Sequence, residues 1–227
     1  MTPNPSAGPL GGFAGALTAD EWEQLSQEGR RRRFPRGATL FNEGESSDRV
    51  LLLLSGRVKI SYFTEDGREV VLALRSAGDI LGELSALDGE PRSASAIALE
   101  PVDALLLSAD RFRDFLSARP RVALLLLEML ARRLRDADRK RVEFGAYDTV
   151  GRVARRLVEL ADRFGEPDGD TIHIVLPLSQ DELAGWIGAS RKAVGNALAW
   201  LRARNLIETR RRGVSIRDID GLRKRAT

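Results

Sequence analysis

Apolar residues near the C-terminal end recur at helical spacing and predict two short helices joined by a tight turn. Ser179 followed three residues later by Glu182 forms a capping box, which opens the first helix. Gly188 ends it, because glycine enters a left-handed turn without a side-chain clash, and Ser190 can cap the second helix. The apolar positions are Leu183, Trp186 and Ile187 in the first helix and Ala193, Val194, Ala197 and Leu198 in the second.

The second helix of this pair keeps Arg191, Lys192 and Asn196 off its apolar face. A helix-turn-helix motif needs this arrangement, since its second helix lies in the DNA major groove with N-terminal side chains on the base edges. For these residues alone, an ordinary helical hairpin with a solvated charged face is the alternative.

Two short segments after this pair, Leu206–Thr209 and Val214–Ile216, predict strands on either side of an arginine-rich loop. This is the pattern of a winged helix-turn-helix, in which Arg211 and Arg212 at the wing tip would contact the phosphate backbone. Without the preceding motif, such a loop would be interpreted as a solvated turn.

The N-terminal half alternates short strand-like segments with turn residues from Phe34 to Leu107, which predicts a small β-barrel or sandwich. Asp66-Gly67 between Lys59–Phe63 and Glu69–Leu74 is a strong hairpin signal. Arg30–Arg33 continue directly into a strand-like segment, so we expect these arginines at a solvent-exposed edge of the β-structure.

A long helix is predicted from Arg121 to near Tyr147, and Asp148–Gly151 breaks it with a cap and a glycine that suit a hinge. Its apolar stripe can pack on the barrel, on a second copy of the chain, or on both. Because its end is highly charged, a parallel coiled coil explains the projection, whereas the alternative is a solvated polar tail. The residues expected at the dimer interface are Leu127, Leu130, Leu134 and Ala137.

The 227 residues include no cysteine and one histidine, His173, in a predicted strand. This excludes disulfides, cysteine-ligated iron–sulfur clusters and the usual His/Cys metal sites. From Thr149 onward there are 15 Lys/Arg and 10 Asp/Glu, a net of +5, whereas the preceding residues hold 21 and 23, a net of −2. The basic excess lies on the helix-turn-helix part, as nucleic-acid binding favours.

The chain has no run of eighteen apolar residues, and its first residues lack the basic and apolar regions of a signal peptide. We therefore expect a cytoplasmic protein with no membrane partner. Residues 1–15 are expected to form a disordered leader.

A possible phosphate site lies within residues 82–94. Gly82 lets the backbone approach a ligand closely, and the Glu83 carboxylate can accept hydrogen bonds from ligand hydroxyls. Arg92 supplies a rigid fork for a phosphate, and Ser93 adds a hydroxyl. Taken alone, a Glu83–Arg92 salt bridge that closes a loop is the competing interpretation.

Several motifs in order resemble the CRP/FNR family of bacterial transcription regulators. Gly82-Glu-Leu followed by Pro91-Arg-Ser-Ala resembles the phosphate-binding cassette of cyclic-nucleotide-binding domains, and the segments Phe34–Glu45 and Val50–Ile60 resemble their opening strands. Leu130–Leu134, Gly151–Ala154 and the helix-turn-helix match the rest. The resemblance implies an α+β fold, with a β-barrel (jelly-roll) cyclic-nucleotide-binding domain over 16–119, a long dimerisation helix over 120–147, and a winged helix-turn-helix domain over 148–227.

The resemblance also implies site residues. Glu83 would bind the ribose hydroxyl, Arg92 with Ser93 the cyclic phosphate, and Gly82 and Leu84 would offer backbone contacts. The implied DNA-contacting residues are Ser179, Gln180, Ser190, Arg191, Lys192, Asn196, Arg211 and Arg212.

Two departures from the family pattern bear on specificity. The positions that read adenine in cyclic-AMP members hold Ala137 and Asp138, and Asp138 could accept from adenine or guanine. Lys192 stands where the family usually has glutamate, and Asn196 where it usually has arginine. Because lysine can only donate, we predict a guanine read by Arg191 but a changed base at the Lys192 step.

We therefore expect a homodimeric transcription regulator, not an enzyme, whose affinity for a pseudo-palindromic DNA operator is gated by a cyclic nucleotide. Cyclic AMP is the first choice of ligand, with cyclic GMP or another nucleotide possible. No prosthetic group or metal is expected, and RNA polymerase is the expected protein partner. The alternative is a ligand-independent DNA-binding regulator with a vestigial pocket.

Overall fold

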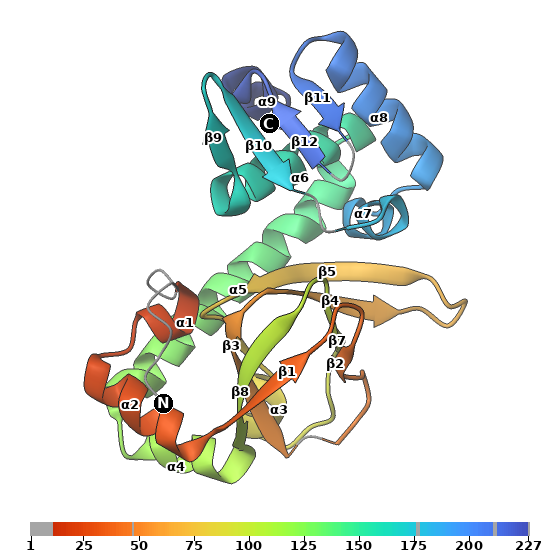
Figure 1. The fold of residues 1–227 in the computed structure, drawn as a ribbon. Coiled ribbons are helices and arrows are strands. Elements are labelled where there is room, and N and C mark those ends of the chain that lie inside the picture. Colours follow the sequence, from red (N-terminus) through yellow and green to blue (C-terminus); the bar gives the residue numbers. More distant parts are fainter. Residues whose placement is uncertain (1–10, 47, 176–177, 211–212, 227) are drawn as a thin grey trace. The chain divides into compact units, whose positions relative to one another are not determined.

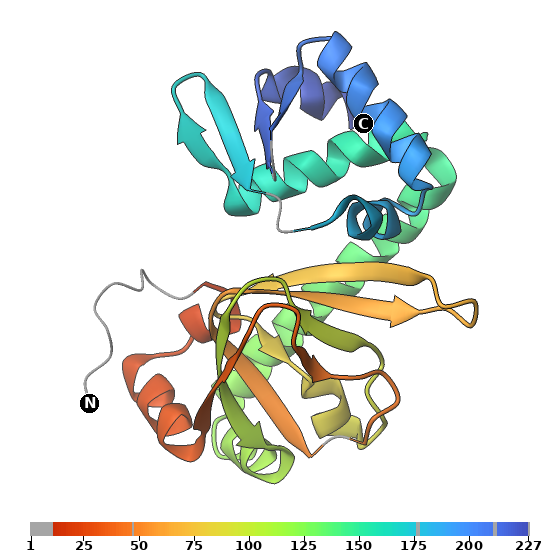
Figure 2. The same cartoon turned by 45° about the vertical axis from the view of Figure 1, so that its right-hand side comes forward.

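The computed structural model describes residues 11–46, 48–175, 178–210 and 213–226. The chain divides into two compact units. The N-terminal unit contains the residues up to Tyr62 together with Leu72–Leu134, and the C-terminal unit contains Phe63–Val71 together with the residues from Arg135 onward. Figures 1 and 2 show β-structure gathered in the first unit and helices dominating the second.

The strands of the first half are β1 Arg30–Phe34, β2 Thr39–Phe41, β3 Arg49–Ser55, β4 Arg57–Phe63, β5 Glu69–Ser76, β6 Ile80–Leu81, β7 Ser95–Ala98 and β8 Val102–Ser108. They form two four-stranded sheets with the orders β1-β8-β3-β6 and β2-β7-β4-β5. The jelly-roll prediction is confirmed, as two separate sheets and not one closed barrel. Strand β1 is an edge strand, and its four arginines are exposed as predicted.

Strand β3 is buried on both faces. Because alternate side chains of a strand point to opposite sides, its apolar run reaches two cores. Val50 and Leu52 lie in a core shared with the helices, and Leu51 and Leu53 lie in a second core with Phe34.

The helices of the N-terminal unit cover the first of these cores. They are α1 Gly12–Gly15, α2 Ala19–Glu28, α3 Glu83–Asp88, α4 Ala109–Ser117 and the start of α5 Pro120–Ala146. Part of the leader predicted over 1–15 is thus helical, because Phe13 is buried in the same core as Phe112. Residues 1–10 lie outside the described part of the chain.

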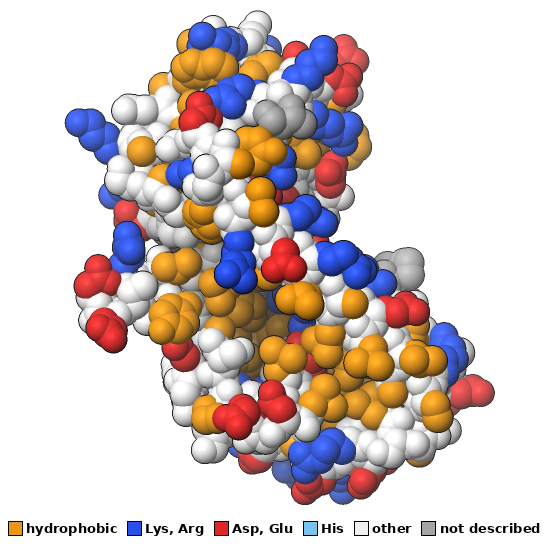
Figure 3. Space-filling view, turned by 180° about the vertical axis from the view of Figure 1, so that it is seen from behind, with side chains coloured by type: hydrophobic (Ala, Val, Ile, Leu, Met, Phe, Trp, Pro, Cys, Tyr) orange, Lys and Arg blue, Asp and Glu red, His pale blue; other side chains and the backbone are white. Residues whose placement is uncertain are grey.

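Helix α5 carries two apolar stripes rather than one. Val122, Leu126 and Met129 are buried in the core, and Leu130 packs against it partly buried. Leu127 and Leu134 are 60% and 64% exposed. Figure 3 shows hydrophobic side chains gathered on the face of the N-terminal unit along which α5 runs. The predicted dimer contact of Leu127, Leu130, Leu134 and the exposed Ala137 remains a prediction.

Besides Phe63–Val71, the C-terminal unit contains the end of α5, α6 Thr149–Phe164, β9 Glu166–Asp168, β10 Thr171–Val175, α7 Gln180–Ile187, α8 Arg191–Ala203, β11 Ile207–Arg210, β12 Gly213–Ile216 and α9 Ile219–Arg225. Its strands form a sheet in the order β11-β12-β10-β9. His173 lies in β10 as predicted, with Nδ1 at 3.2 Å from the Ser215 hydroxyl oxygen. The hairpin of β11 and β12 matches the predicted wing strands, whereas Arg211 and Arg212 lie outside the described residues.

Candidate ligand pocket and nucleic-acid interface

The guanidinium of Arg92 is buried in the N-terminal unit, with the residue 4% exposed. Its Nη1 donates to the Gly82 carbonyl at 2.9 Å, and its Nη2 donates to the Arg49 carbonyl at 2.6 Å. The Phe41 ring stacks on the guanidinium, with a carbon-to-centroid distance of 4.3 Å. Burial lowers the pKa of Arg92, although a guanidinium stays protonated in proteins. A rigid cation is therefore held in place in a low-dielectric site.

The carboxylate of Glu83 is also buried, at the first position of α3. Its Oε1 accepts from Arg133 Nη1 at 2.6 Å, and Arg133 Nη2 also donates to the Ile80 carbonyl at 2.9 Å. The competing interpretation of a Glu83–Arg92 salt bridge does not describe this arrangement, because Glu83 forms its ion pair with Arg133 on α5.

Gly82 joins the two charged groups. Its φ is +77°, in the region that favours glycine, and a Cβ built there would lie 1.8 Å from Arg92 Nη1. The structure thus brings Gly82, Glu83 and Arg92 together, with the exposed Leu84 and Ser93 following Glu83 and Arg92 in the chain. A buried fork beside a buried carboxylate suits a ligand that carries both an anionic group and hydroxyls.

Asp138 belongs to the C-terminal unit. It lines a cavity of about 480 Å³ with Arg135, Arg139, Val142, Glu143, Tyr147 and Arg155. The contact of Asp138 with a nucleotide base remains a prediction.

The helix-turn-helix forms as predicted from its local signals. Ser179 accepts from the Glu182 amide and completes a capping box, and Ser190 accepts from the Ala193 amide. Gly188 adopts φ +68° at the turn. The hydroxyls of both serines are therefore used to cap helices α7 and α8, and their predicted contact with DNA is untested.

The base-reading candidates are exposed on α8. Arg191, 64% exposed at its side chain, donates from Nε to Gln180 Oε1 at 3.0 Å and lies 3.7 Å from the Asp181 carboxylate. Lys192 and Asn196 are exposed on the same helix. Residues of α7 therefore orient the arginine that is predicted to read guanine.

Sequence reasoning did not single out Phe41, Arg133 or Asp181 as site residues. Phe41 lies inside the family-like segment Phe34–Glu45, and Arg133 lies inside Leu130–Leu134. The resemblance of these segments to the family is the signal that could have found both residues. Their roles depend on contacts across about fifty residues of sequence, since Arg133 reaches Glu83 and Phe41 reaches Arg92.

Within the described ranges, no helix is long and apolar enough to cross a membrane, and no cluster of His, Cys, Asp or Glu could hold a metal ion.

Two family models match the chain: the cyclic nucleotide-binding domain over residues 31–119 and the Crp-like helix-turn-helix domain over residues 151–225. A CRP-like cAMP-activated global transcriptional regulator from Mycobacterium tuberculosis is 40% identical over 193 residues, covering 85% of this chain and 86% of the relative. The cAMP-activated global transcriptional regulator CRP of Pasteurella multocida is 32% identical over 179 residues, covering 77% and 84%.

Among solved structures, a CRP-family transcriptional regulator from Thermus thermophilus is 27% identical with a TM-score of 0.73, covering 86% of this chain and 96% of that one. The c-di-GMP responsive global regulator CLP of Xanthomonas campestris is 25% identical with a TM-score of 0.76, covering 88% and 99%. The cyclic nucleotide-binding match contains Gly82, Glu83 and Arg92, and the helix-turn-helix match contains the capped helices α7 and α8. The chain belongs to the CRP/FNR family of transcription regulators, DNA-binding proteins that are not enzymes and that carry a cyclic-nucleotide-binding domain.

Proposed function

We propose that this regulator is a homodimer whose affinity for DNA is gated by cyclic AMP. The observation that carries the proposal is the buried Arg92 fork beside the buried Glu83 carboxylate, joined by Gly82. The cyclic phosphate would take hydrogen bonds that Arg92 now gives to backbone carbonyls, and Glu83 would accept from the ribose hydroxyl. The relatives described as cAMP-activated support this choice of ligand.

The exposed Leu127 and Leu134 support pairing of two α5 helices, since a row of large apolar side chains on a charged helix is typical of a dimer seam. Two recognition helices related by the dimer axis would read a pseudo-palindromic operator in successive major grooves. RNA polymerase is the protein partner that a promoter-bound regulator would recruit or block.

The experiment is a calorimetric titration of the purified protein with cyclic AMP and cyclic GMP, paired with operator affinity measured with and without each nucleotide. Micromolar binding of cyclic AMP together with a tighter operator complex is the expected result. Binding of neither nucleotide, or an operator affinity that no nucleotide changes, would overturn the proposal.

A second candidate is a regulator with an altered base preference or none. Ala137 can neither donate to nor accept from a base, and Asp138 can accept from the two guanine donors. In the titration above, tighter binding of cyclic GMP favours an altered pocket, and nucleotide-independent operator binding favours a vestigial one.

A further inference from the structure

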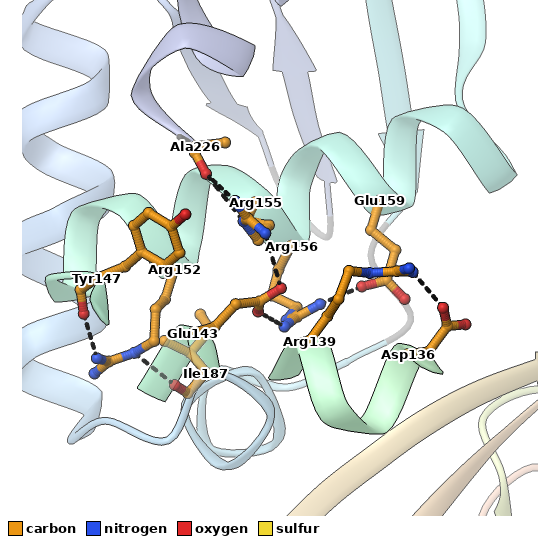
Figure 4. Close-up of polar contacts among 10 residues, drawn as sticks. All are labelled: Asp136, Arg139, Glu143, Tyr147, Arg152, Arg155, Arg156, Glu159, Ile187 and Ala226. Carbon is orange, nitrogen blue, oxygen red and sulfur yellow. Dashed lines mark hydrogen bonds and ion pairs between the residues drawn. The ribbon is translucent and has the colours of Figure 1, made fainter. Parts of the chain in front are cut away.

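The end of α5 contains a buried carboxylate in a highly charged segment. Residues 135–139 are all exposed, yet Glu143, one turn further on, is 4% exposed. A buried carboxylate is unfavourable unless it is paired and hydrogen-bonded. Figure 4 shows its environment, where the last turns of α5 face α6.

Both oxygens of this carboxylate are occupied. Oε1 accepts from Arg155 Nη1 at 3.2 Å, and Oε2 forms a short contact with Arg156 Nη2. Arg156, itself buried, also pairs with Glu159 on its own helix. Glu143 thus connects α5 to two adjacent arginines of α6.

The two arginines extend the connection to other parts of the C-terminal unit. Arg155 donates from Nε and Nη2 to the Ala226 carbonyl at 2.9 and 2.7 Å, which ties in the end of α9. Arg156 lies 5.6 Å from the ring centroid of Trp186 on α7. Lys140 of α5 lies over the same indole, at 5.9 Å.

The residues beside Glu143 also reach the turn of the helix-turn-helix. A Cβ built on Gly188 would lie 2.1 Å from the Phe144 ring, so this ring packs directly on the turn. Arg152 donates to the Ile187 carbonyl at 3.1 Å and to the Tyr147 carbonyl at 2.7 Å, which bridges the break between α5 and α6 (Figure 4).

We propose that Glu143 is a positioning residue that fastens residues 140–147 of the long helix to the recognition module, so that this segment and the helix-turn-helix move as one body. The module that carries the recognition helix then begins at residue 140, and the break at Asp148 is a rigid corner instead of the hinge that the sequence suggested. Residues 135–139, whose side chains are all exposed, lie outside this body.

This fastening has a functional consequence that rests on the proposed function. A rotation imposed on the long helix by a nucleotide would reach the recognition helix through Glu143. Loss of the carboxylate would weaken that transmission while leaving Gly82, Glu83 and Arg92, which belong to the other unit, unchanged.

The first test is native-state hydrogen exchange of the full-length protein in low denaturant, which needs no ligand. Residues 140–147 should open together with α6, at the same denaturant dependence. In E143Q the amides of 140–147 should exchange about tenfold faster while α6 and β10 keep their protection. The matched control is D136N, which removes an exposed ion pair with Arg139 from the same helix and should leave the pattern unchanged.

Two results of this test would overturn the proposal: opening of 140–147 before α6 in the unaltered protein, or an E143Q effect that is absent or spreads evenly over the whole unit. If E143Q does not fold, R155Q replaces it, because Arg156 still neutralises Glu143 in that variant. R155Q should accelerate exchange at 140–147 in the same local manner, and failure to do so counts against the proposal.

The second test concerns gating. E143Q should bind cyclic AMP within about twofold of the unaltered protein, while the gain in operator affinity caused by the nucleotide falls about tenfold. D136N should retain that gain. A full gain in E143Q overturns the transmission role. If the operator affinity of the unaltered protein does not respond to the nucleotide, the proposed function fails. The hydrogen-exchange experiment then still tests whether Glu143 fastens residues 140–147 to the recognition module.

Discussion

The proposed nucleotide pocket and the proposed recognition helix each depend on an arginine, but the environments of these two arginines are opposite. Arg92 is buried and already holds two carbonyls and an aromatic ring. Arg191 is exposed and touches only the α7 side chains Gln180 and Asp181 among the contacts of the described residues. The side chains of the proposed pocket are preorganised in a low-dielectric site, whereas the proposed DNA-binding surface stays solvated until its cations bind phosphates and release the counterions condensed on the DNA.

The difference predicts how each region responds to substitution. A buried cation that has lost its partners, or partners that have lost their cation, leave unsatisfied groups in the interior. Exposed arginines and lysines can be exchanged with little cost to the fold, and their contribution appears in affinity and salt dependence.

The largest effect is expected for R92A. Loss of two charge-assisted hydrogen bonds to the phosphate should weaken nucleotide binding by about 3 kcal/mol, or roughly 100-fold. Titration calorimetry measures the change, with R36A, an exposed arginine of the same unit, as the control. An R92A protein that binds nucleotide as tightly as R36A would show that Arg92 does not hold the phosphate.

Alanine substitutions at Gly82 and Gly89 separate the effect of a steric collision with Arg92 from the effect of backbone strain. Gly82 and Gly89 flank α3 with φ values of +77° and +78°, but a Cβ on Gly89 meets nothing within 4 Å, whereas one on Gly82 collides with Arg92. Both alanine variants should lose about 1 kcal/mol of unfolding free energy to the left-handed conformation.

Only G82A should also displace the Arg92 fork and weaken nucleotide binding, by roughly tenfold or more. Chemical denaturation and calorimetry of the two variants give both numbers. Equal nucleotide affinities in G82A and G89A would show that the close approach to Arg92 is unimportant.

On the exposed side, K192E should change the base preference and leave the fold intact. Lysine donates to guanine O6 or N7, whereas glutamate accepts from cytosine N4, a discrimination of about 1–3 kcal/mol per half-site. Operator selection followed by binding assays should show altered preference at that step with the Arg191 guanine retained. An unchanged selected site would place Lys192 outside base recognition.

The regions also differ in how far the sequence could predict them. Ser179, Gly188 and Ser190 act through bonds to residues no more than four positions away, so the helix pair could be predicted from local signals. Arg133 meets Glu83 only because α5 packs on the sheet that contains β3, β6 and β8, and no sequence spacing reveals this packing.

Helix α5 shows, within one element, that sequence spacing alone does not reveal which residues are buried. Its leucines recur at several helical spacings, and only packing separates the buried Leu126 from the exposed Leu127. No local pattern indicates that Glu143 is buried, because the arginines that pair with it come from a helix whose direction the sequence does not specify.

The smallest effect is expected at Asp148, an exposed charge of the C-terminal unit. Hydrogen bonds from Arg225, and secondarily from the Gly151 amide, lower the pKa of this carboxyl below its ordinary value of 3.8. A depressed pKa in the folded state stabilises the protein fully above the unfolded-state value, and the contribution is lost as the pH falls through the folded-state value.

D148N keeps an N-cap for α6 but removes the charge, so it should cost less than about 1 kcal/mol near neutral pH. The difference from the unaltered protein should shrink below pH 3.8 and vanish once the pH lies below the lowered folded-state pKa, where the carboxyl is protonated in both states. Urea denaturation across this pH range measures the difference in unfolding free energy. R225Q should show the same pH dependence, because this substitution removes the other half of the ion pair. A cost of several kcal/mol in D148N would mean that this corner depends on an exposed charge as strongly as the pocket depends on a buried one, and the contrast between the two regions would fail.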